Sequence, residues 1–321
     1  MTVAGNYWRR AIDETRFPTR AAVHPTEEGT HVLVEENRPA GRVRGEVLLM
    51  HGLEGSSRSG YMISMAQRLA ELGFAAHRMN MRSCGGSEHL TPTLYHSGLT
   101  SDTLALLQRF RAEHRGPLFL IGFSLGGNVV LKLAGELGGQ GRELIAGVCA
   151  VSTPLDLLAC VGAIGRRENR IYERRFVRRL CERYRRKHAA DAERFPLDGL
   201  EQVRSIYEFD DRFTAKAFGF GDAASYYRTQ SAIRFLPAIR VPVLMIQAQD
   251  DPMIPFGIFE GPAVISNPHI SLVAPRHGGH LGFLSWQRPR FWADQVVGMW
   301  IQGQVKEPEG EQSMPVPRLE Q

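Results

Sequence analysis

The five residues Gly122-Phe-Ser124-Leu-Gly126 lie between an apolar strand pattern over residues 117–121 and a helix pattern that begins at Asn128. A serine on such a strand-to-helix turn projects its Oγ above the sheet. The flanking positions need glycine, because a side chain there would collide with the turn or the neighbouring strand. The N-terminal end of the following helix favours negative charge at the same place. The pattern predicts a nucleophile elbow with Ser124 as a catalytic nucleophile; a purely structural turn is the alternative.

Strand and helix patterns alternate on both sides of this turn. Strands are expected at residues 29–37, 46–50, 74–81, 117–121, 144–151, 241–247 and 270–274, and helices at 61–72, 100–114, 128–137 and 290–302. The run Glu46–Met50 is continuously apolar after its first residue, as in a parallel strand that is buried on both faces. The alternation predicts an α/β fold with a mostly parallel, doubly wound sheet covered on both faces. A chain of 321 residues that is 43% hydrophobic can bury such a core.

The alternation breaks after Pro154, and residues 155–236 contain helix patterns but no convincing strand. This segment is expected to be a helical insertion that forms a lid over the sheet edge. The domain prediction is therefore an N-terminal extension over residues 1–28, one α/β domain over 29–303, and a tail over 304–321. The tail is rich in Pro, Glu and Gln, which predicts disorder.

A serine hydroxyl needs a base within hydrogen-bond reach, and that base needs a third group to orient it. Residues after two later strands supply both, in the order acid and then histidine: Asp250-Asp251-Pro252 follows one strand, and His277-Gly-Gly-His280 follows the next. We assign His280 as the base and Asp251 as the carboxylate, since the acid of such triads usually stands four residues before a proline, as Asp251 stands before Pro255. Asp250 and His277 are the alternatives. The two histidines could also bind a metal, but no further ligand has suitable spacing, so no metal is expected.

The loop His51-Gly-Leu53-Glu-Gly-Ser-Ser57 follows a buried strand and can turn backbone N–H groups toward a substrate carbonyl. The proposed oxyanion donors are the N–H of Leu53 and the N–H of Leu125, the residue after the nucleophile. Glu54 is unexpected beside an oxyanion, and its carboxylate is expected to turn away. The alternative is that the glycines of this loop serve the fold alone.

With these residues placed, the chain resembles the YheT-like branch of the α/β-hydrolase superfamily over residues 10–303. The resemblance rests on seven segments. They are residues 51–57, 79–87, 94–100, 122–128, Tyr226-Tyr227 with Ser231, Asp250-Asp251-Pro252, and residues 277–280. It implies an α/β-hydrolase fold and a serine hydrolase that acts on carboxylic esters without a cofactor, with the nucleophile at Ser124, the acid in the Asp250/Asp251 pair and the base at His280. It also implies medium-chain acyl esters or lipid esters as the substrate class.

Charge is concentrated in the predicted insertion, where residues 166–187 carry ten Arg and one Lys against three Glu. Within this stretch Val177, Leu180, Cys181 and Tyr184 follow helical spacing and form one apolar stripe on a cationic helix. One interpretation is a covering helix with solvated arginines. Another is a surface that attracts anionic lipid headgroups or acidic substrates. Nucleic acid is not expected as a partner, since no binding motif accompanies the charge.

The cysteines and the lengths of the apolar runs bear on the compartment in which the protein is expected. The four cysteines, Cys84, Cys149, Cys160 and Cys181, form no C-x-x-C pair and are expected to be reduced packing residues. The absence of a signal-peptide pattern and of a long apolar run predicts a cytoplasmic protein, with peripheral membrane contact left open. Two alternatives to ester hydrolysis remain: acyl transfer through the same acyl-enzyme, and a catalytically idle fold used as a binding module.

Overall fold

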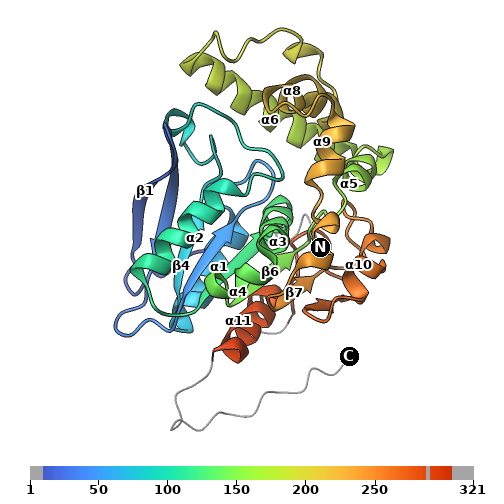
Figure 1. Ribbon diagram of the computed structural model, residues 1–321. Helices are drawn as coiled ribbons and strands as arrows, with labels where there is room; N and C mark the ends of the chain where they lie inside the picture. The colour runs from blue at the N-terminus through green and yellow to red at the C-terminus, as the bar shows by residue number, and fades with distance from the viewer. Residues whose placement is uncertain (1–9, 287–289, 306–321) are drawn as a thin grey trace.

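The computed structural model describes residues 10–286 and 290–305 of the chain. Its centre is an eight-stranded sheet with the spatial order β1-β2-β4-β3-β5-β6-β7-β8 (Figure 1). The strands are β1 (Thr19–Glu27), β2 (Thr30–Asn37), β3 (Glu46–Met50), β4 (Ala75–Met79), β5 (Leu118–Phe123), β6 (Gly147–Val151), β7 (Val243–Ile246) and β8 (Ile270–Val273). The pairs β1/β2 and β2/β4 are antiparallel, and all other neighbours are parallel. The prediction of a mostly parallel α/β sheet is confirmed.

The parallel strands end in register at one edge of the sheet. Phe123 at the end of β5 pairs with Val151 of β6, which pairs with Ile246 of β7, which pairs with Val273 of β8. Met50 at the end of β3 pairs with Gly122, one residue before the end of β5. The loops that follow these strands therefore open at a common edge, which is where open α/β sheets bind their ligands.

Helices cover both faces of the sheet. The helices are α1 (Gly60–Glu71), α2 (Ser101–Glu113), α3 (Leu125–Leu137), α4 (Gly141–Leu144), α5 (Leu157–Ile164), α6 (Arg170–Ala190), α7 (Ile206–Phe209), α8 (Ala215–Ala217), α9 (Ala223–Gln230), α10 (Pro262–Ile265) and α11 (Trp292–Gln304). Along β3, Val47 and Leu49 pack in one core with residues of α1 and α11, while Leu48 and Met50 pack in the other with residues of α2 and α3. This alternation confirms the doubly wound arrangement, since successive strand side chains point to opposite faces.

Strand β1 was not among the predicted strands. It lies within the range predicted as an N-terminal extension, and residues 1–9 of that range lie outside the described residues. Most of its residues are exposed, since it forms the outer edge of the sheet and pairs only with β2. Its pairing with β2 is irregular between Pro25 and Glu27, as proline cannot donate to the ladder. An exposed edge strand of this kind has no alternating apolar pattern by which to recognise it.

The segment between β6 and β7 contains helices α5 to α9 and no strand among its residues, all of which are described. It has a small core of its own, in which Leu180 and Tyr184 of α6 pack with Phe195, Phe209 and Phe213. The apolar stripe predicted on α6 is therefore buried against the rest of this segment. Figure 1 shows that α6, α8 and α9 all lie beyond one end of the sheet. The predicted disordered tail falls mainly on residues 306–321, which lie outside the described residues.

Within the part of the chain that the structure describes, no helix is long and apolar enough to cross a membrane. The four cysteines are buried and unpaired, as expected for packing residues. Burial raises the pKa of the Cys149 and Cys160 thiols well above their usual value.

Candidate active site

Ser124 occupies the turn between β5 and α3 in a strained backbone conformation, with φ +51°. Few non-glycine residues adopt a positive φ, and such strain persists only where the surroundings hold it. Here the Ser124 N–H donates to the Val151 carbonyl at 2.8 Å, and the Gly127 N–H donates to the Ser124 carbonyl at 2.8 Å. The turn is thereby fixed to the neighbouring strand on one side and to the first turn of α3 on the other.

The glycines on either side of the serine are required by close backbone contacts. A Cβ at Gly122 would lie 2.3 Å from the Gly126 carbonyl oxygen. A Cβ at Gly126 would lie 2.5 Å from the Met50 carbonyl oxygen at the end of β3. Both atoms belong to the backbone and cannot move aside. The collision predicted from the sequence is therefore confirmed for both positions.

The structure brings Ser124, His280 and Asp251 into one hydrogen-bonded line. His280 Nε2 lies 3.0 Å from Ser124 Oγ, and its Nδ1 lies 2.9 Å from Asp251 Oδ2. The three residues come from loops after β5, β8 and β7, which open at the same sheet edge. Both contacts are within the range of a good hydrogen bond. With the Nδ1 proton donated to Asp251, the Nε2 lone pair faces the serine hydroxyl.

The Asp251 side chain is fully buried, and both of its carboxylate oxygens accept hydrogen bonds. Its Oδ1 accepts from the N–H groups of Met253 at 2.9 Å and Ile254 at 3.2 Å. Its Oδ2, which faces His280, also accepts from the Gln247 amide at 3.2 Å. Backbone donors of this kind stabilise the carboxylate form and fix its orientation.

The adjacent carboxylate, Asp250, points to a different part of the same region. Its Oδ1 accepts from the N–H groups of Gly278 at 2.9 Å and Gly279 at 2.7 Å, and its Oδ2 lies 3.2 Å from His277 Nδ1. Partial burial alone would raise the pKa of Asp250, but these N–H donors and His277 outweigh it and lower the pKa. Asp250 therefore holds the loop that carries His280, and His277 lies on Asp250, with its side chain 76% exposed.

The two histidines thus bind different carboxylates rather than one shared ligand. Among the described residues, no three His, Cys, Asp or Glu side chains gather in a group that could hold a metal ion.

The loop after β3 lies directly against Ser124. A Cβ at Gly52 would be 2.9 Å from Ser124 Cβ, so glycine is required for this approach. The Gly52 N–H donates to Tyr61 Oη at 2.9 Å, and the Glu54 N–H donates to Tyr95 Oη at 3.0 Å. Between them, the Leu53 N–H has no acceptor within the described part of the chain.

The Leu125 N–H also lacks an acceptor among the described residues, as expected in the first turn of a helix. Leu53 and Leu125 both line the pocket that contains Ser124 and His280. Both residues predicted to supply oxyanion donors therefore line the pocket of the serine, and their role stays a prediction.

His51, at the start of the same loop, is a neutral structural residue. Its Nδ1 lies 2.8 Å from the Gly52 carbonyl, and its Nε2 accepts from the Met81 N–H at 3.1 Å. The proton must therefore be on Nδ1. Complete burial lowers the pKa of His51 to about 4, so the ring stays uncharged near neutral pH.

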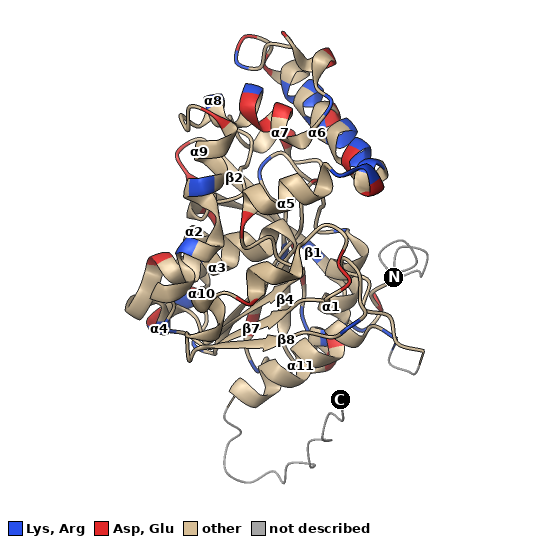
Figure 2. Cartoon of the chain, turned by 90° about the vertical axis from the view of Figure 1, so that its right-hand side faces the viewer, with Lys and Arg blue, Asp and Glu red and all other residues tan. Residues whose placement is uncertain are grey.

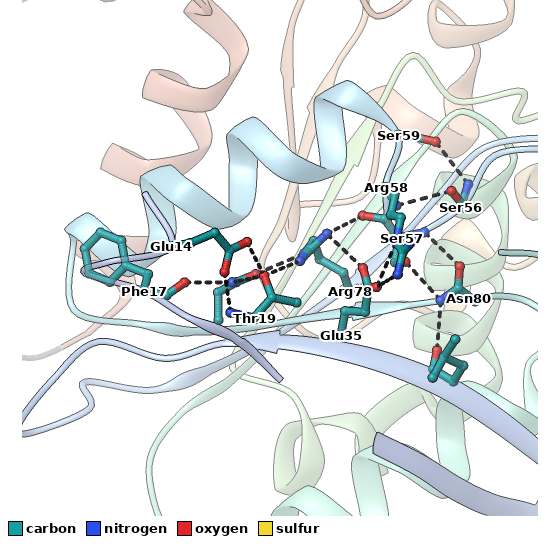
Figure 3. A network of polar contacts seen from close by, with 12 residues as sticks. Glu14, Phe17, Thr19, Glu35, Ser56, Ser57, Arg58, Ser59, Arg78 and Asn80 are labelled. Carbon is teal, nitrogen blue, oxygen red and sulfur yellow. Dashed lines mark hydrogen bonds and ion pairs between the residues drawn. The ribbon is translucent and has the colours of Figure 1, made fainter. Parts of the chain in front are cut away.

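A buried polar network fixes the far end of this loop to β2 and β4 (Figure 3). The Asn80 side chain accepts from the Ser57 N–H at 2.9 Å and donates to Ser57 Oγ at 3.0 Å. Arg78 donates to the Ser57 carbonyl at 2.6 Å and forms a buried ion pair with Glu35 at 3.2 Å. The loop is thus anchored at both ends before any substrate binds.

Glu54 makes contacts that the sequence did not indicate. Its carboxylate accepts from the Tyr95 hydroxyl at 2.9 Å and forms an ion pair with Arg183 of α6 at 2.8 Å. Nothing in the sequence distinguishes Arg183 from the nine other arginines of the basic stretch. In the structure it is the one arginine of that stretch that is buried.

Several segments of the sequence resemblance meet beside the site through hydrogen bonds. The Asn128 amide donates to the Ser97 carbonyl at 2.8 Å and accepts from the Ala232 N–H at 2.7 Å. The Tyr226 hydroxyl donates to Ser97 Oγ at 2.6 Å. These contacts tie the end of the helical segment to α3, which explains the polar residues at these positions.

Two pockets meet at Ser124. The first is mostly apolar and is bounded by α5 and α6, with Leu157, Val161, Ile164, Phe176 and Leu180 among its lining residues. The second is lined by residues of the loop after β3, by Tyr61 and by three arginines, Arg10, Arg175 and Arg179. Ser124, His280 and Leu53 belong to both. An ester bound across Ser124 could place one part in each pocket.

Comparisons with known proteins agree with this architecture. A family model described as the alpha/beta hydrolase fold matches residues 46–285. The Escherichia coli (strain K12) protein YheT is 31% identical over 306 residues, which is 94% of this chain and 88% of that protein. Phospholipase ABHD3 of Mus musculus is 30% identical, covering 82% of this chain but 64% of its own length. A monoacylglycerol lipase of Saccharomyces cerevisiae is 30% identical over 77% of this chain and 56% of its own length.

Among solved structures, the esterase Pf2001 of Pyrococcus furiosus superposes with a TM-score of 0.60 at 16% identity, covering 93% of this chain and 99% of that one. Likeness at this identity shows a common fold. The family model spans most of the chain, and YheT matches over nearly its whole length. This chain therefore belongs to the α/β-hydrolase fold family and, within it, to the YheT-like branch.

Proposed function

We propose that this protein is a serine hydrolase that cleaves carboxylic esters through an acyl-enzyme. In this proposal Ser124 is the nucleophile, His280 is the general base and acid, and Asp251 orients His280 and stabilises its protonated form. The observation that carries the proposal is the unbroken hydrogen-bonded line from Ser124 Oγ through the His280 ring to Asp251. Family membership and the lipase and phospholipase names of two relatives support ester hydrolysis as the reaction class.

The proposed reaction has two halves. His280 Nε2 takes the hydroxyl proton as Ser124 Oγ bonds to the ester carbonyl carbon, and the carbonyl oxygen becomes an oxyanion. His280 then gives this proton to the leaving alkoxide, which departs as an alcohol and leaves an acyl-serine. Water, deprotonated by His280, attacks the acyl carbon, and the proton returns to Ser124 as the carboxylic acid leaves.

The proposed oxyanion donors are the N–H groups of Leu53 and Leu125. Both are free of intramolecular acceptors among the described residues, and both lie beside Ser124. Fixed donors that need no reorganisation stabilise the developing charge, and one such donor typically contributes about 3 kcal/mol to transition-state stabilisation.

The two pockets suggest how an ester would bind. The apolar pocket under α5 and α6 suits the acyl chain, because its walls are aliphatic and aromatic side chains. The second pocket suits the alcohol part, and Arg10, Arg175 and Arg179 there favour an alcohol that carries negative charge or lies in an anionic surface. Short or medium-chain acyl esters and lipid esters are the proposed substrate class.

In the same proposal the helical segment over residues 155–236 acts as the lid. Its helices α5 and α6 supply much of the wall of the acyl pocket. Lys and Arg residues gather along α6, as Figure 2 shows. One face of α6 carries Ile171, Arg174, Arg175 and Arg178 at helical spacing, and the Ile171 side chain is 80% exposed. An exposed apolar residue among arginines is suited to an anionic membrane surface, so this face is the proposed site of peripheral membrane contact.

Turnover of p-nitrophenyl esters tests the proposal. The wild-type protein should hydrolyse a short or medium-chain ester, and Ser124→Ala should reduce kcat by about 10⁵-fold or more while the protein stays folded. A series of rising acyl length, followed by glycerides and phospholipids, would define the chain preference. Turnover that survives Ser124→Ala would contradict the assignment of the nucleophile. A folded wild type without turnover of any ester in the series would favour the binding module instead.

A further inference from the structure

Glu54 stands next to the proposed oxyanion donor Leu53 and has a backbone conformation that glutamate rarely adopts. Its φ is +54°, in the left-handed region. A non-glycine residue keeps such a conformation only where its surroundings hold it. Because Leu53 is bonded directly to Glu54, the groups that hold Glu54 also limit the movement of the Leu53 N–H.

Polar groups from two other segments hold Glu54. Its N–H donates to Tyr95 Oη at 3.0 Å, and its carboxylate accepts from the Tyr95 hydroxyl at 2.9 Å. The same carboxylate oxygen accepts from Arg183 Nε at 2.8 Å. The Glu54 carbonyl also receives a long contact of 3.5 Å from Arg179 Nη1. Both arginines belong to α6, so the proposed lid helix contacts the loop through the residue after the donor.

The Glu54–Arg183 ion pair is buried on both sides. The Glu54 side chain is 4% exposed and that of Arg183 is 3% exposed. The Arg183 guanidinium lies over the Tyr95 ring, 4.6 Å from its centroid. A buried charge that loses its partner is strongly disfavoured, because water cannot replace the lost contact. Helix α6 therefore cannot leave the loop without breaking this pair.

Another ion pair of α6 provides a comparison. Arg186 pairs with Glu88 at 2.5 Å and also joins α6 to the body of the protein, but its side chain is 53% exposed. Neither Arg186 nor Glu88 lines a pocket that contains Ser124. The two pairs thus differ in burial and in their relation to the oxyanion loop, while both hold the same helix.

We infer that Glu54 and Arg183 are positioning residues, which fix the Leu53 N–H toward the oxyanion only when α6 is docked. This inference rests on the proposed function, and it makes lid closure and completion of the oxyanion hole a single event. Substrate binding and the chemical step then respond differently to loss of the pair. The ester can still enter the apolar pocket, whereas the transition state loses a well-placed donor.

Steady-state kinetics with p-nitrophenyl butyrate tests the inference in four variants: Glu54→Gln, Arg183→Ala, the double variant, and Arg186→Ala as the matched control. Glu54→Gln and Arg183→Ala should each lower kcat by about tenfold or more, with KM changed by less than about threefold. The loss of kcat in the double variant should be no larger than the loss in the more damaged single variant, since the two residues act as one unit. Guanidinium ion at about 10 mM should restore part of kcat in Arg183→Ala but not in the double variant. The Arg186→Ala control should stay within about twofold of wild type.

The inference fails if both single variants keep kcat within about twofold of wild type, or if their losses multiply in the double variant. Circular dichroism and the unfolding temperature verify that each variant is folded. Should Glu54→Gln not fold, Tyr95→Phe removes the hydroxyl that contacts both the Glu54 N–H and its carboxylate, and the same loss of kcat is expected. Failure of the proposed function would be seen separately, as a wild type without turnover that depends on Ser124.

Discussion

Asp250 and Asp251 are adjacent in the chain but make different contacts, and this difference leads to opposite expectations for two similar substitutions. Asp251→Asn should reduce kcat by about 10³- to 10⁴-fold, because the amide no longer favours the tautomer in which His280 Nε2 faces Ser124. The expectation follows from the contact of the Asp251 carboxylate with His280 Nδ1 at 2.9 Å. Measurement of kcat with a p-nitrophenyl ester checks the result.

Asp250→Asn is the matched control, since it changes the same chemical group one residue away. Asp250 accepts hydrogen bonds from Gly278 and Gly279 and holds the loop, so a loss of less than about tenfold in kcat is expected, together with some loss of stability. If Asp250→Asn were the more damaging of the two, the assignment of the acid would be wrong.

The residues that the sequence could identify are those with a local signature. Ser124 stands in a glycine-flanked turn, and the acid and base each follow an apolar strand run. The residues that it missed, Tyr95 and Arg183, act through contacts between segments far apart in the chain. Arg183 differs from its neighbouring arginines only in its burial, and burial on a helix whose other faces are cationic depends on what packs against it.

At the scale of elements, helix α6 has two faces with separate expected roles. Leu180 and Tyr184 pack in the core of the helical segment, while Arg174, Arg175 and Arg178 point outward around Ile171. The structure thus confirms that the apolar stripe packs in the core. The arginines on the other side are exposed, and their contact with an anionic surface remains a proposal.

Removal of the outer charge tests the proposed membrane contact. Arg174, Arg175, Arg178 and Arg179 replaced together by Gln should weaken binding to vesicles of phosphatidylcholine with phosphatidylglycerol by on the order of 100- to 1000-fold. This estimate takes about 1 kcal/mol for each charge near an anionic surface. Vesicle co-sedimentation at low and physiological salt measures the effect, which should shrink as salt screens the charges.

A control variant removes the same charge elsewhere: Arg20, Arg142, Arg234 and Arg240 are exposed and lie outside α6. This variant should bind anionic vesicles almost as well as the wild type. Equal loss in both variants would indicate a response to net charge alone and would contradict a membrane contact at α6.

Strands and helices could be predicted from the sequence where they belong to the central, covered part of the sheet. Strands buried on both faces appear as apolar runs, and the covering helices α1 and α3 end beside glycines, at Gly73 and Gly138. Strand β1 was not predictable, because it is an exposed edge whose pairing with β2 depends on the rest of the sheet. The short turns α7 and α8 and the π-helical turn at Asp210–Thr214 likewise depend on tertiary packing.

For the whole molecule, a buried carboxyl group in the helical segment makes folding stability depend on pH. Burial raises the pKa of Asp210 to about 6 from its usual 3.8, although the hydroxyls of Thr214 and Tyr227 donate to it. Between these two values the folded state binds more protons than the unfolded state, so the stability due to this group is lost as the pH rises. A pKa difference of this size changes the free energy of unfolding by about 3 kcal/mol.

Chemical denaturation of the wild type and Asp210→Asn at pH 4 and pH 7 measures this effect. Relative to the variant, the free energy of unfolding of the wild type should fall by on the order of 2 to 3 kcal/mol from pH 4 to pH 7. Asp294, whose pKa burial also raises to about 6, is present in both proteins and cancels in the comparison. A difference between the two proteins that does not change with pH would contradict this account of Asp210.

In the proposed function, groups from three loops act together on one serine. Covalent labelling with a fluorophosphonate, followed by mass spectrometry of the digested protein, tests this arrangement most directly. We expect about one label per chain. The label should be on the peptide that contains Ser124, absent in Ser124→Ala and strongly slowed in His280→Ala. A folded wild type that takes no label, or takes it on another residue while Ser124→Ala labels equally well, would contradict the account.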